Sequence, residues 1–227
     1  MKVIIPFKFD SSRCRRKNVR EFFDGDSLLD IAIKHFLKHD HDVYLVCVNG
    51  PETKQLIKKH NVNHIVLNDD SNNWIKVLIE LSGILNKVFG PNELICFWQC
   101  VAPLFWLYND IQDFMSFAEE KIYEEECESV VPVYEFADYL VNENMQGINF
   151  GPGSWHAVSQ DLPKLYYITP MGVSTPAVYE KYRYTYSPNS TMWVAEGPYI
   201  DIDTEEEMKI AQILYKEKIK ELKNDCI

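Results

Sequence analysis

Two groups of charged residues near opposite ends of the chain have the chemistry of a phosphate and metal site. Residues 11–18 read Ser-Ser-Arg-Cys-Arg-Arg-Lys-Asn. Point cations, forked guanidinium groups and small hydrogen-bonding side chains are the mixture that triphosphate oxygens bind. Asp201 and Asp203 are separated by one residue, so an extended backbone directs both carboxylates to the same side. Such a pair can share a hard cation, and Mg²⁺ is the natural candidate.

Each group taken alone also has a purely structural interpretation. Runs of charge are commonly solvated surface, and Asp203 with Thr204 could cap the terminal helix. Taken together, cations and paired carboxylates are what an enzyme needs to hold a nucleoside triphosphate, and they predict a nucleotidyltransferase. The Gly-rich patterns of P-loop NTPases and of dinucleotide-binding enzymes are absent from the sequence.

Composition narrows the partners and the compartment. The 227 residues are 46% hydrophobic, which is enough for one main domain with a real core. A formal charge of -11 gives an acidic average surface, so we expect a small anionic ligand and neither nucleic acid nor membrane as partner. The six cysteines include no Cys-x-x-Cys pair, and no signal peptide or membrane-spanning run is recognisable. A cytoplasmic protein is therefore predicted.

The elements that must position the charged groups alternate between strand and helix. Apolar strands are predicted at 3–5, 43–48, 65–67 and 94–98, with helices at 27–38, 51–60 and 74–88 between them. This order predicts an α/β fold with a Rossmann-like, three-layer, mostly parallel sheet. Ligands of such sheets bind beyond the carboxyl ends of the strands, so the loops after Ile5, Val48 and Trp98 should face one site.

The last third of the chain is less regular. Residues 139–188 are rich in Gly, Pro and Tyr and have weak periodicity, which indicates loops, short antiparallel strands or an oligomer contact. A strand at 191–195 and a terminal helix from Glu205 are predicted beyond them.

Four motifs in this order resemble the acylneuraminate cytidylyltransferase family, the enzymes that make CMP-sialic acid. Residues 4–6, 11–13, 16–20 and 25–29 resemble the opening strand, signature loop and first helix of that family, with Lys17 and Asn18 at the centre. Residues 99–104 resemble its Gln-Pro-Thr-Ser-Pro-Leu segment, and residues 188–194 resemble Pro-Asn-Gly-Ala-Ile-Tyr-Ile. Residues 200–205 match Ile-Asp-Ile-Asp-Thr-Glu. The resemblance covers most of the chain.

The resemblance implies a single cytidylyltransferase domain over residues 1–227, of the nucleotide-diphospho-sugar transferase type, with a dimerisation and acceptor-site insertion around 139–188. It implies a homodimer that transfers CMP from CTP to a sialic or related nonulosonic acid and releases pyrophosphate. Lys17, Asp201 and Asp203 would be catalytic, and the two aspartates would hold Mg²⁺. The remaining roles that it implies are nucleotide binding for Lys8, Ser11, Arg13, Lys17 and Asn18, and substrate binding for Gln99 and Asn189.

Departures from the family pattern leave the acceptor open. Lys8 stands where the family has Arg, and Ser12 replaces a Lys, so phosphate binding would shift onto Lys8, Arg13 and Lys17 without the guanidinium fork at position 8. Ser187 replaces a basic residue that would face the substrate carboxylate, unless Arg183 takes its place.

Three other functions therefore remain open at this point. One is a cytidylyltransferase for another acceptor, such as a phosphonate, and a second is a catalytically silent nucleotide-binding relative. Val101 and Ala102, which replace the Thr-Ser hydroxyls of the family, favour these two. A glycosyltransferase that uses its Asp-x-Asp is disfavoured, because the pair comes late in the chain and the basic loop would have no purpose.

Overall fold

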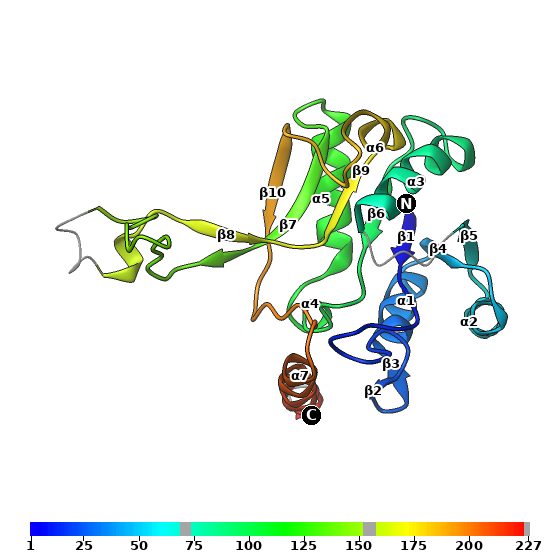
Figure 1. The fold of residues 1–227 in the computed structure, drawn as a ribbon, viewed down its shortest axis with the longest axis horizontal. Coiled ribbons are helices and arrows are strands. Elements are labelled where there is room, and N and C mark those ends of the chain that lie inside the picture. Colours follow the sequence, from blue (N-terminus) through cyan, green and yellow to red (C-terminus); the bar gives the residue numbers. More distant parts are fainter. Residues whose placement is uncertain (69–73, 152–157, 225–227) are drawn as a thin grey trace.

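The computed structural model describes residues 1–68, 74–151 and 158–224, which form an eight-stranded mixed sheet covered by helices (Figure 1). The strands lie in the order β5-β4-β1-β6-β9-β7-β10, and β8 pairs with the far half of β7. Their bounds are β1 Lys2–Pro6, β4 Asp42–Val48, β5 Asn63–Leu67, β6 Ile95–Trp98, β7 Ser129–Phe136, β8 Leu165–Ile168, β9 Met171–Ser174 and β10 Ser190–Val194.

Only β8 and β9 run against the direction of the other strands. The predicted α/β fold with a mostly parallel sheet is therefore confirmed. A two-stranded ribbon of β2 and β3 follows the basic loop. The bounds of the ribbon and the helices are β2 Glu21–Phe23, β3 Asp26–Ser27, α1 Leu28–Lys38, α2 Pro51–His60, α3 Trp74–Val88, α4 Phe105–Tyr108, α5 Ile111–Tyr123, α6 Pro176–Tyr182 and α7 Glu205–Asn224.

Alternation along the central strands builds a core on each face of the sheet. In β1, Val3 and Ile5 point into one cluster with α1, α5 and α7, while Ile4 points into the other with α3 and α6. In β6, Trp98 points into the first cluster and Phe97 into the second. This period of two is the direct consequence of strand geometry. No helix in the described part of the chain is both long and apolar enough to cross a membrane.

The three helices predicted in the first half begin and end close to the expected residues because their ends carry clear signals. The side chain of Ser27 accepts from the Asp30 amide at 3.1 Å, and the Asp30 carboxylate accepts from the Ser27 amide at 2.9 Å, which forms a capping box. α2 begins at Pro51 and ends before Asn61, which adopts the left-handed conformation.

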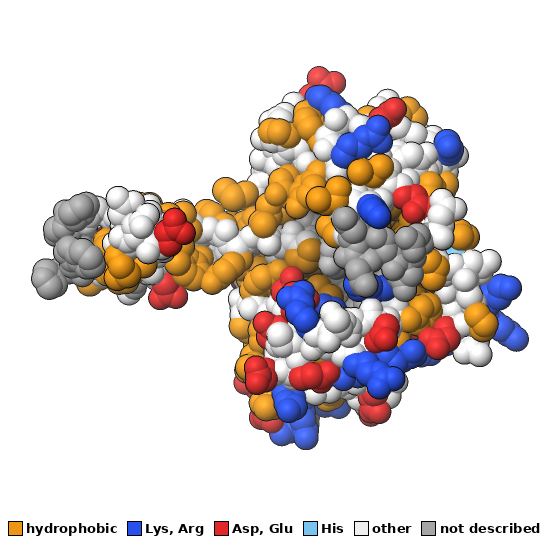
Figure 2. Space-filling view, in the orientation of Figure 1, with side chains coloured by type: hydrophobic (Ala, Val, Ile, Leu, Met, Phe, Trp, Pro, Cys, Tyr) orange, Lys and Arg blue, Asp and Glu red, His pale blue; other side chains and the backbone are white. Residues whose placement is uncertain are grey.

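The predicted insertion at 139–188 divides into two parts. The hairpin of β7 and β8 and the described parts of its connection, residues 137–151 and 158–164, project from the body as an arm, with apolar side chains along it and at its root (Figures 1 and 2). The rest completes the main sheet, because β9 lies between β6 and β7 and α6 packs on α3. Gly172 allows β9 to lie this close to β7, since a Cβ there would lie 3.1 Å from the Val130 carbonyl oxygen.

A charge cluster around the buried side chains of Asp30 and His60 connects the end of α2 to the start of α1. Asp30 Oδ1 lies 2.6 Å from Lys59 Nζ and 2.6 Å from His60 Nε2, and the side chains of Asp30 and His60 are both buried. Burial alone would raise the pKa of Asp30, but hydrogen bonds from His60, Lys59 and Ser27 outweigh it and hold that pKa well below its usual range. The ionised carboxylate is thus a structural element of this corner of the fold.

We expect Asp30→Asn to lower the free energy of unfolding at pH 7 by about 1–3 kcal/mol, because buried donors lose a charged partner. A carboxyl pKa lowered by folding contributes its full stability above the ordinary carboxyl pKa of about 4, and this contribution begins to decline as the pH falls below that value towards the lowered pKa. Urea unfolding from pH 7 to pH 3.5 should therefore show the gap between variant and wild type narrowing. Asp113→Asn, at an exposed position in α5, is the control. A gap that is absent at pH 7 or widens in acid contradicts the assignment.

Candidate active site

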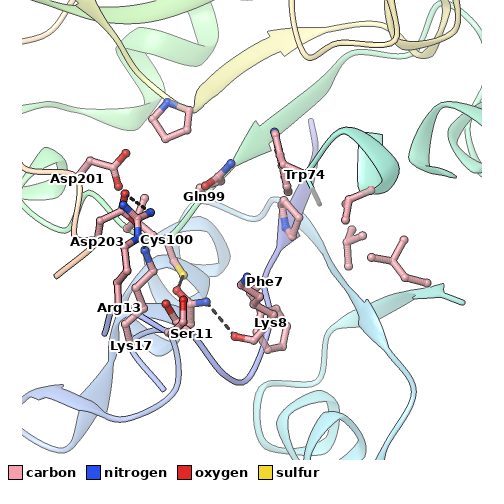
Figure 3. A pocket seen from close by; sticks show the side chains of 18 residues that line it. Phe7, Lys8, Ser11, Arg13, Lys17, Trp74, Gln99, Cys100, Asp201 and Asp203 are labelled. Carbon is pink, nitrogen blue, oxygen red and sulfur yellow. Dashed lines mark hydrogen bonds and ion pairs between the residues drawn. The ribbon is translucent and has the colours of Figure 1, made fainter. Parts of the chain in front are cut away.

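A pocket of about 620 Å³ opens at the carboxyl ends of β1, β4, β5 and β6 (Figure 3). The predicted loops after β1 and β6 both face it, whereas Val46 of β4, rather than the loop after Val48, forms part of its wall. Its lining includes the predicted residues Lys8, Ser11, Arg13, Lys17, Asn18, Gln99, Asp201 and Asp203.

At one side of this pocket the basic loop meets the acidic segment directly. Arg13 Nη2 lies 2.7 Å from Asp203 Oδ2, and Lys17 Nζ lies 2.8 Å from Asp203 Oδ1. Lys17 also donates to the carbonyl oxygen of Ile202. Burial would raise the pKa of Asp203, but the Lys17 hydrogen bond and the charges of Lys17 and Arg13 hold it below the usual range. Groups separated by 190 residues in sequence therefore form one electrostatic unit.

Asp201 is in a different situation from Asp203. Burial raises its pKa, and the neighbouring Asp203 charge raises it further. Among residues 1–68, 74–151 and 158–224, no side-chain hydrogen bond or ion pair engages its carboxylate, although it lines the pocket. A half-buried carboxylate that forms no ion pair of its own is a good acceptor for a cation.

The donor set fits a hard divalent ion that takes most of its ligands from elsewhere. Within the described part of the chain, no three His, Cys, Asp or Glu side chains converge closely enough to hold a metal by themselves. Mg²⁺ is commonly held by one or two carboxylates together with water and substrate phosphates. Asp201 and Asp203 provide that pair of oxygen donors beside the phosphate-seeking cations.

Contacts on both sides of Ile202 fix the acidic segment in place. The Ile202 side chain is fully buried, and its amide donates to the Val101 carbonyl at 3.0 Å. Glu207 accepts from the amides of Asp203 at 2.8 Å and Thr204 at 2.7 Å. The Thr204 hydroxyl accepts from the Glu207 amide in return. The start of α7 therefore carries a capping box whose acid also orients Asp203.

The turn that leads from β10 to this segment requires glycine. Gly197 has φ +83°, and a Cβ there would lie 2.4 Å from the ring of Tyr108. Asn109, which follows α4, forms two hydrogen bonds through its side-chain amide to the backbone of Glu196. Its Nδ2 donates to the Glu196 carbonyl at 3.0 Å, and its Oδ1 accepts from the Glu196 N–H at 2.8 Å. Close contact with α4 thus sets the path by which the chain reaches Asp201.

Further contacts tie the basic loop to its surroundings. Arg20 forms a two-pronged pair with Glu205 at the start of α7, at 2.9 and 2.7 Å. Asn18 donates to the Lys8 carbonyl at 3.0 Å and accepts from the thiol of Cys100 at 3.5 Å. Burial raises the pKa of Cys100 to about 12, so it remains a thiol donor.

Sequence reasoning did not assign site roles to Glu207, Glu205 or Cys100. The first had a recognisable signal, since Thr204 and Glu207 have capping-box spacing. The pairing of Arg20 with Glu205 and the contact of Cys100 with Asn18 are long-range contacts that no local pattern encodes.

A second hollow of about 220 Å³ shares Trp74, Gln99, Pro170 and Asp201 with the main pocket. None of its described lining residues is Lys or Arg, and Tyr184 and Tyr186 pack edge to face within it. The rest of its lining is Phe97, Ile168, Thr169 and Thr185.

The positions that could have supplied a cation here are engaged elsewhere. Ser187 is buried and accepts from the Asn189 amide at 3.0 Å, while Arg183 donates to Ser82 of α3. Arg183 therefore does not take the place of the family's basic residue within one chain. Asn189 lines a separate hollow with Glu128 and Lys181 and is the one predicted site residue outside the main pocket.

Relatives and solved structures agree with this architecture. No family model matches the chain. The chain is 26% identical over 229 residues to the pseudaminic acid cytidylyltransferases of two Campylobacter jejuni subsp. jejuni strains, of serotypes O:2 and O:23/36, covering 94% of this chain and 95% of each relative. A solved CMP:2-keto-3-deoxy-manno-octonic acid synthetase complexed with CTP matches with a TM-score of 0.66 at 13% identity, over 96% of this chain and 98% of that one. A 4-diphosphocytidyl-2C-methyl-D-erythritol synthase from Anaerococcus prevotii matches with a TM-score of 0.63 at 16% identity, over 95% of both chains.

The fold is that of the nucleotide-diphospho-sugar transferases, and its site joins phosphate-seeking cations to paired carboxylates. The class predicted from the motifs, a CTP-dependent cytidylyltransferase, is confirmed by these relatives. Within that class, the curated relatives are pseudaminic acid cytidylyltransferases, which confirms the resemblance to enzymes that act on sialic-acid-like sugars.

Proposed function

We propose that this protein transfers CMP from CTP to a nonulosonic acid of the sialic or pseudaminic type and releases pyrophosphate. The observation that carries the proposal is the pair of aspartates in the main pocket: Asp203 is held by Arg13 and Lys17, and Asp201 lies nearby without an ion pair in the described part of the chain. The names of the curated relatives support the acceptor class.

The two ends of the main pocket suit the two ends of CTP. Lys8, Arg13 and Lys17 supply positive charge for the triphosphate, with Ser11 and Asn18 beside them. Away from Arg13 and Lys17, an apolar part of the lining offers a surface on which the base would pack: Val46, Leu67, Trp74 and Val77. Gln99 lies between these two ends in Figure 3 and also lines the second hollow, which we assign to the acceptor.

The reaction is an in-line displacement at the α-phosphorus. The acceptor hydroxyl oxygen forms a new bond to phosphorus as the bond to the bridging oxygen of pyrophosphate breaks, and the hydroxyl proton passes to solvent water. Chemistry of this kind depends on positioning and on neutralising charge. Arg13 and Lys17 would hold the departing pyrophosphate, and Asp201 and Asp203 would hold Mg²⁺. When bound, Mg²⁺ supplies charge neutralisation and lowers the pKa of the attacking hydroxyl.

We expect purified protein to release pyrophosphate from CTP with Mg²⁺ and one acceptor from a panel of sialic acids, pseudaminic acid and phosphonates, and not from UTP, GTP or ATP. Asp201→Asn and Asp203→Asn should each lower turnover at least about a hundredfold, because transition-state charge loses a positioned partner. Glu206→Gln, an exposed change in the first turn of α7, is the matched control.

The outcomes separate the open alternatives. Turnover with a phosphonate and with no sugar acid would support CMP transfer from CTP but show that the acceptor is a phosphonate. No turnover with any acceptor, while CTP still raises the melting temperature, would indicate a silent nucleotide-binding relative. No turnover and no CTP binding would refute the proposal, and so would full activity in both aspartate variants.

Gln99 offers a test of the assignment of the two hollows. We expect Gln99→Ala to raise the KM for the acceptor about tenfold, which corresponds to the loss of about one hydrogen bond. The KM for CTP should change much less, because the cations that hold the triphosphate are intact. Steady-state kinetics with each substrate varied in turn measures both constants. An equal rise in both KM values would place Gln99 in the nucleotide site instead.

We also propose that residues 1–227 form one catalytic unit that assembles as a homodimer through the arm, in which described apolar side chains such as Met145 and Ile148 are 70% and 60% exposed. Met145→Glu combined with Ile148→Glu should shift the mass measured by light scattering from two chains to one. Ile213→Glu on α7, where the side chain is 62% exposed, should leave it unchanged. A wild-type monomer, or a dimer that tolerates the double change, contradicts this assembly.

Cysteine chemistry supports a reducing, cytoplasmic compartment for this activity. Cys14, Cys47, Cys96, Cys100 and Cys127 are free and buried, and Cys226 lies outside the described residues.

A further inference from the structure

We infer that Arg13 gates the metal site: its guanidinium occupies Asp203 until a bound triphosphate draws it away, so that the metal binds after the nucleotide. This inference rests on the proposed function, because it names the order in which the two ligands enter that site. It concerns how residues of this chain exchange partners, and it can be tested without turnover.

The starting point is that both oxygens of Asp203 are already engaged. Arg13 Nη2 lies 2.7 Å from Oδ2, and Lys17 Nζ lies 2.8 Å from Oδ1. The backbone amide of Asp203 is held by Glu207, so the carboxylate is not able to escape by a shift of the loop alone. A divalent ion that approaches Asp203 meets the positive field of both side chains and competes with them for the carboxylate oxygens, so it binds more tightly once one cation has left.

The two cations differ in how firmly they are held. The Lys17 side chain is 10% exposed and donates to the buried Ile202 carbonyl as well as to Asp203. The Arg13 side chain is 64% exposed, and among the described residues Asp203 is the one partner with which it forms a hydrogen bond or ion pair. Exposed ion pairs contribute little to stability, so Arg13 can leave Asp203 at small cost. Arg13 is therefore the member of the pair that moves, and Lys17 is the fixed one.

A triphosphate in the main pocket offers Arg13 a better partner. Arg13 lines the same pocket as Lys8, Ser11 and Ser12. A guanidinium binds phosphate oxygens through two parallel hydrogen bonds, whereas only one such bond to Asp203 is present here. When Arg13 turns to phosphate, one oxygen of Asp203 becomes available to the metal. By thermodynamic linkage, nucleotide and metal must then strengthen each other's binding.

The test measures Mn²⁺ binding to the nucleotide-free, full-length protein by the electron paramagnetic resonance signal of free Mn²⁺. Arg13→Gln should bind Mn²⁺ at least about fivefold more tightly than wild type, since coupling of this kind is typically fivefold or more. Adding Asp203→Asn to Arg13→Gln should abolish the gain, which shows that the effect runs through that carboxylate.

Arg16→Gln is the matched control. It removes the same charge from the same loop, but Arg16 pairs with Glu52 at 2.9 Å rather than with Asp203. We expect its Mn²⁺ affinity to stay within about twofold of wild type, because a solvent-exposed charge beyond the site is screened. Equal tightening in both arginine variants would show a general charge effect and overturn the gate. Unchanged affinity in Arg13→Gln would overturn it as well.

A second measurement uses the wild-type protein alone. The Arg13 side-chain 15Nε–1H signal should shift when CTP is added in EDTA, because the guanidinium changes partner without metal present. An unmoved signal under conditions where calorimetry shows bound CTP overturns the exchange. Failure of CTP to bind at all refutes the proposed function instead, so the two failures are distinguishable.

Discussion

The contact on which the rest of the site depends is the Asp203 carboxylate between Lys17 and Arg13. A loop that concentrates five basic residues repels itself, and so does a segment that begins Asp-Ile-Asp-Thr-Glu. The opposite charges of the two groups neutralise each other through the ion pairs of Asp203 with Arg13 and Lys17. Arg20 and Glu205 form another ion pair between the same two segments, outside the pocket. These ion pairs hold the basic loop against the surface of a chain whose net charge is -11.

The order of the strands brings these two groups together at the carboxyl end of the sheet. β1 lies between β4 and β6, so the loop that follows it opens at the carboxyl ends of these three parallel strands. The acidic segment comes from β10 at the far edge and must cross back over β7, β9 and β6. The Gly197 turn against Tyr108 starts that return, and the bond from Ile202 to the Val101 carbonyl ends it beside β6. The positions of Asp201 and Asp203 are thus set by the segment that returns from β10 rather than by a strand of the sheet.

The sequence predicted the elements whose signals are local. α1, α2 and α3 could be predicted because caps, Pro51 and apolar spacing lie within each helix, and the main pocket could be predicted because parallel strands place their loops on one edge. β9 could not, since four residues buried on both faces have no alternation and its antiparallel partners are far away in sequence. The position of Asn189 could not be predicted either, because a motif fixes residue types and not the hollow toward which the backbone turns.

The two halves of the site differ in the kind of recognition they can perform. The half that we assign to the nucleotide is built from charge, and Lys8 supplies positive charge there without the guanidinium fork of an Arg. The second hollow has Gln99, threonine hydroxyls and tyrosine rings, and no Lys or Arg among its described lining residues. Ser187 and Arg183 show why: one is buried in a hydroxyl network with Ser129, and the other is turned to α3. If the acceptor is an acid, we propose that its carboxylate is met by the cations of the main pocket or by a second chain. Selectivity for the sugar would thus depend on shape and hydrogen bonds, which discriminate between acceptors with different substituents better than a single cation does.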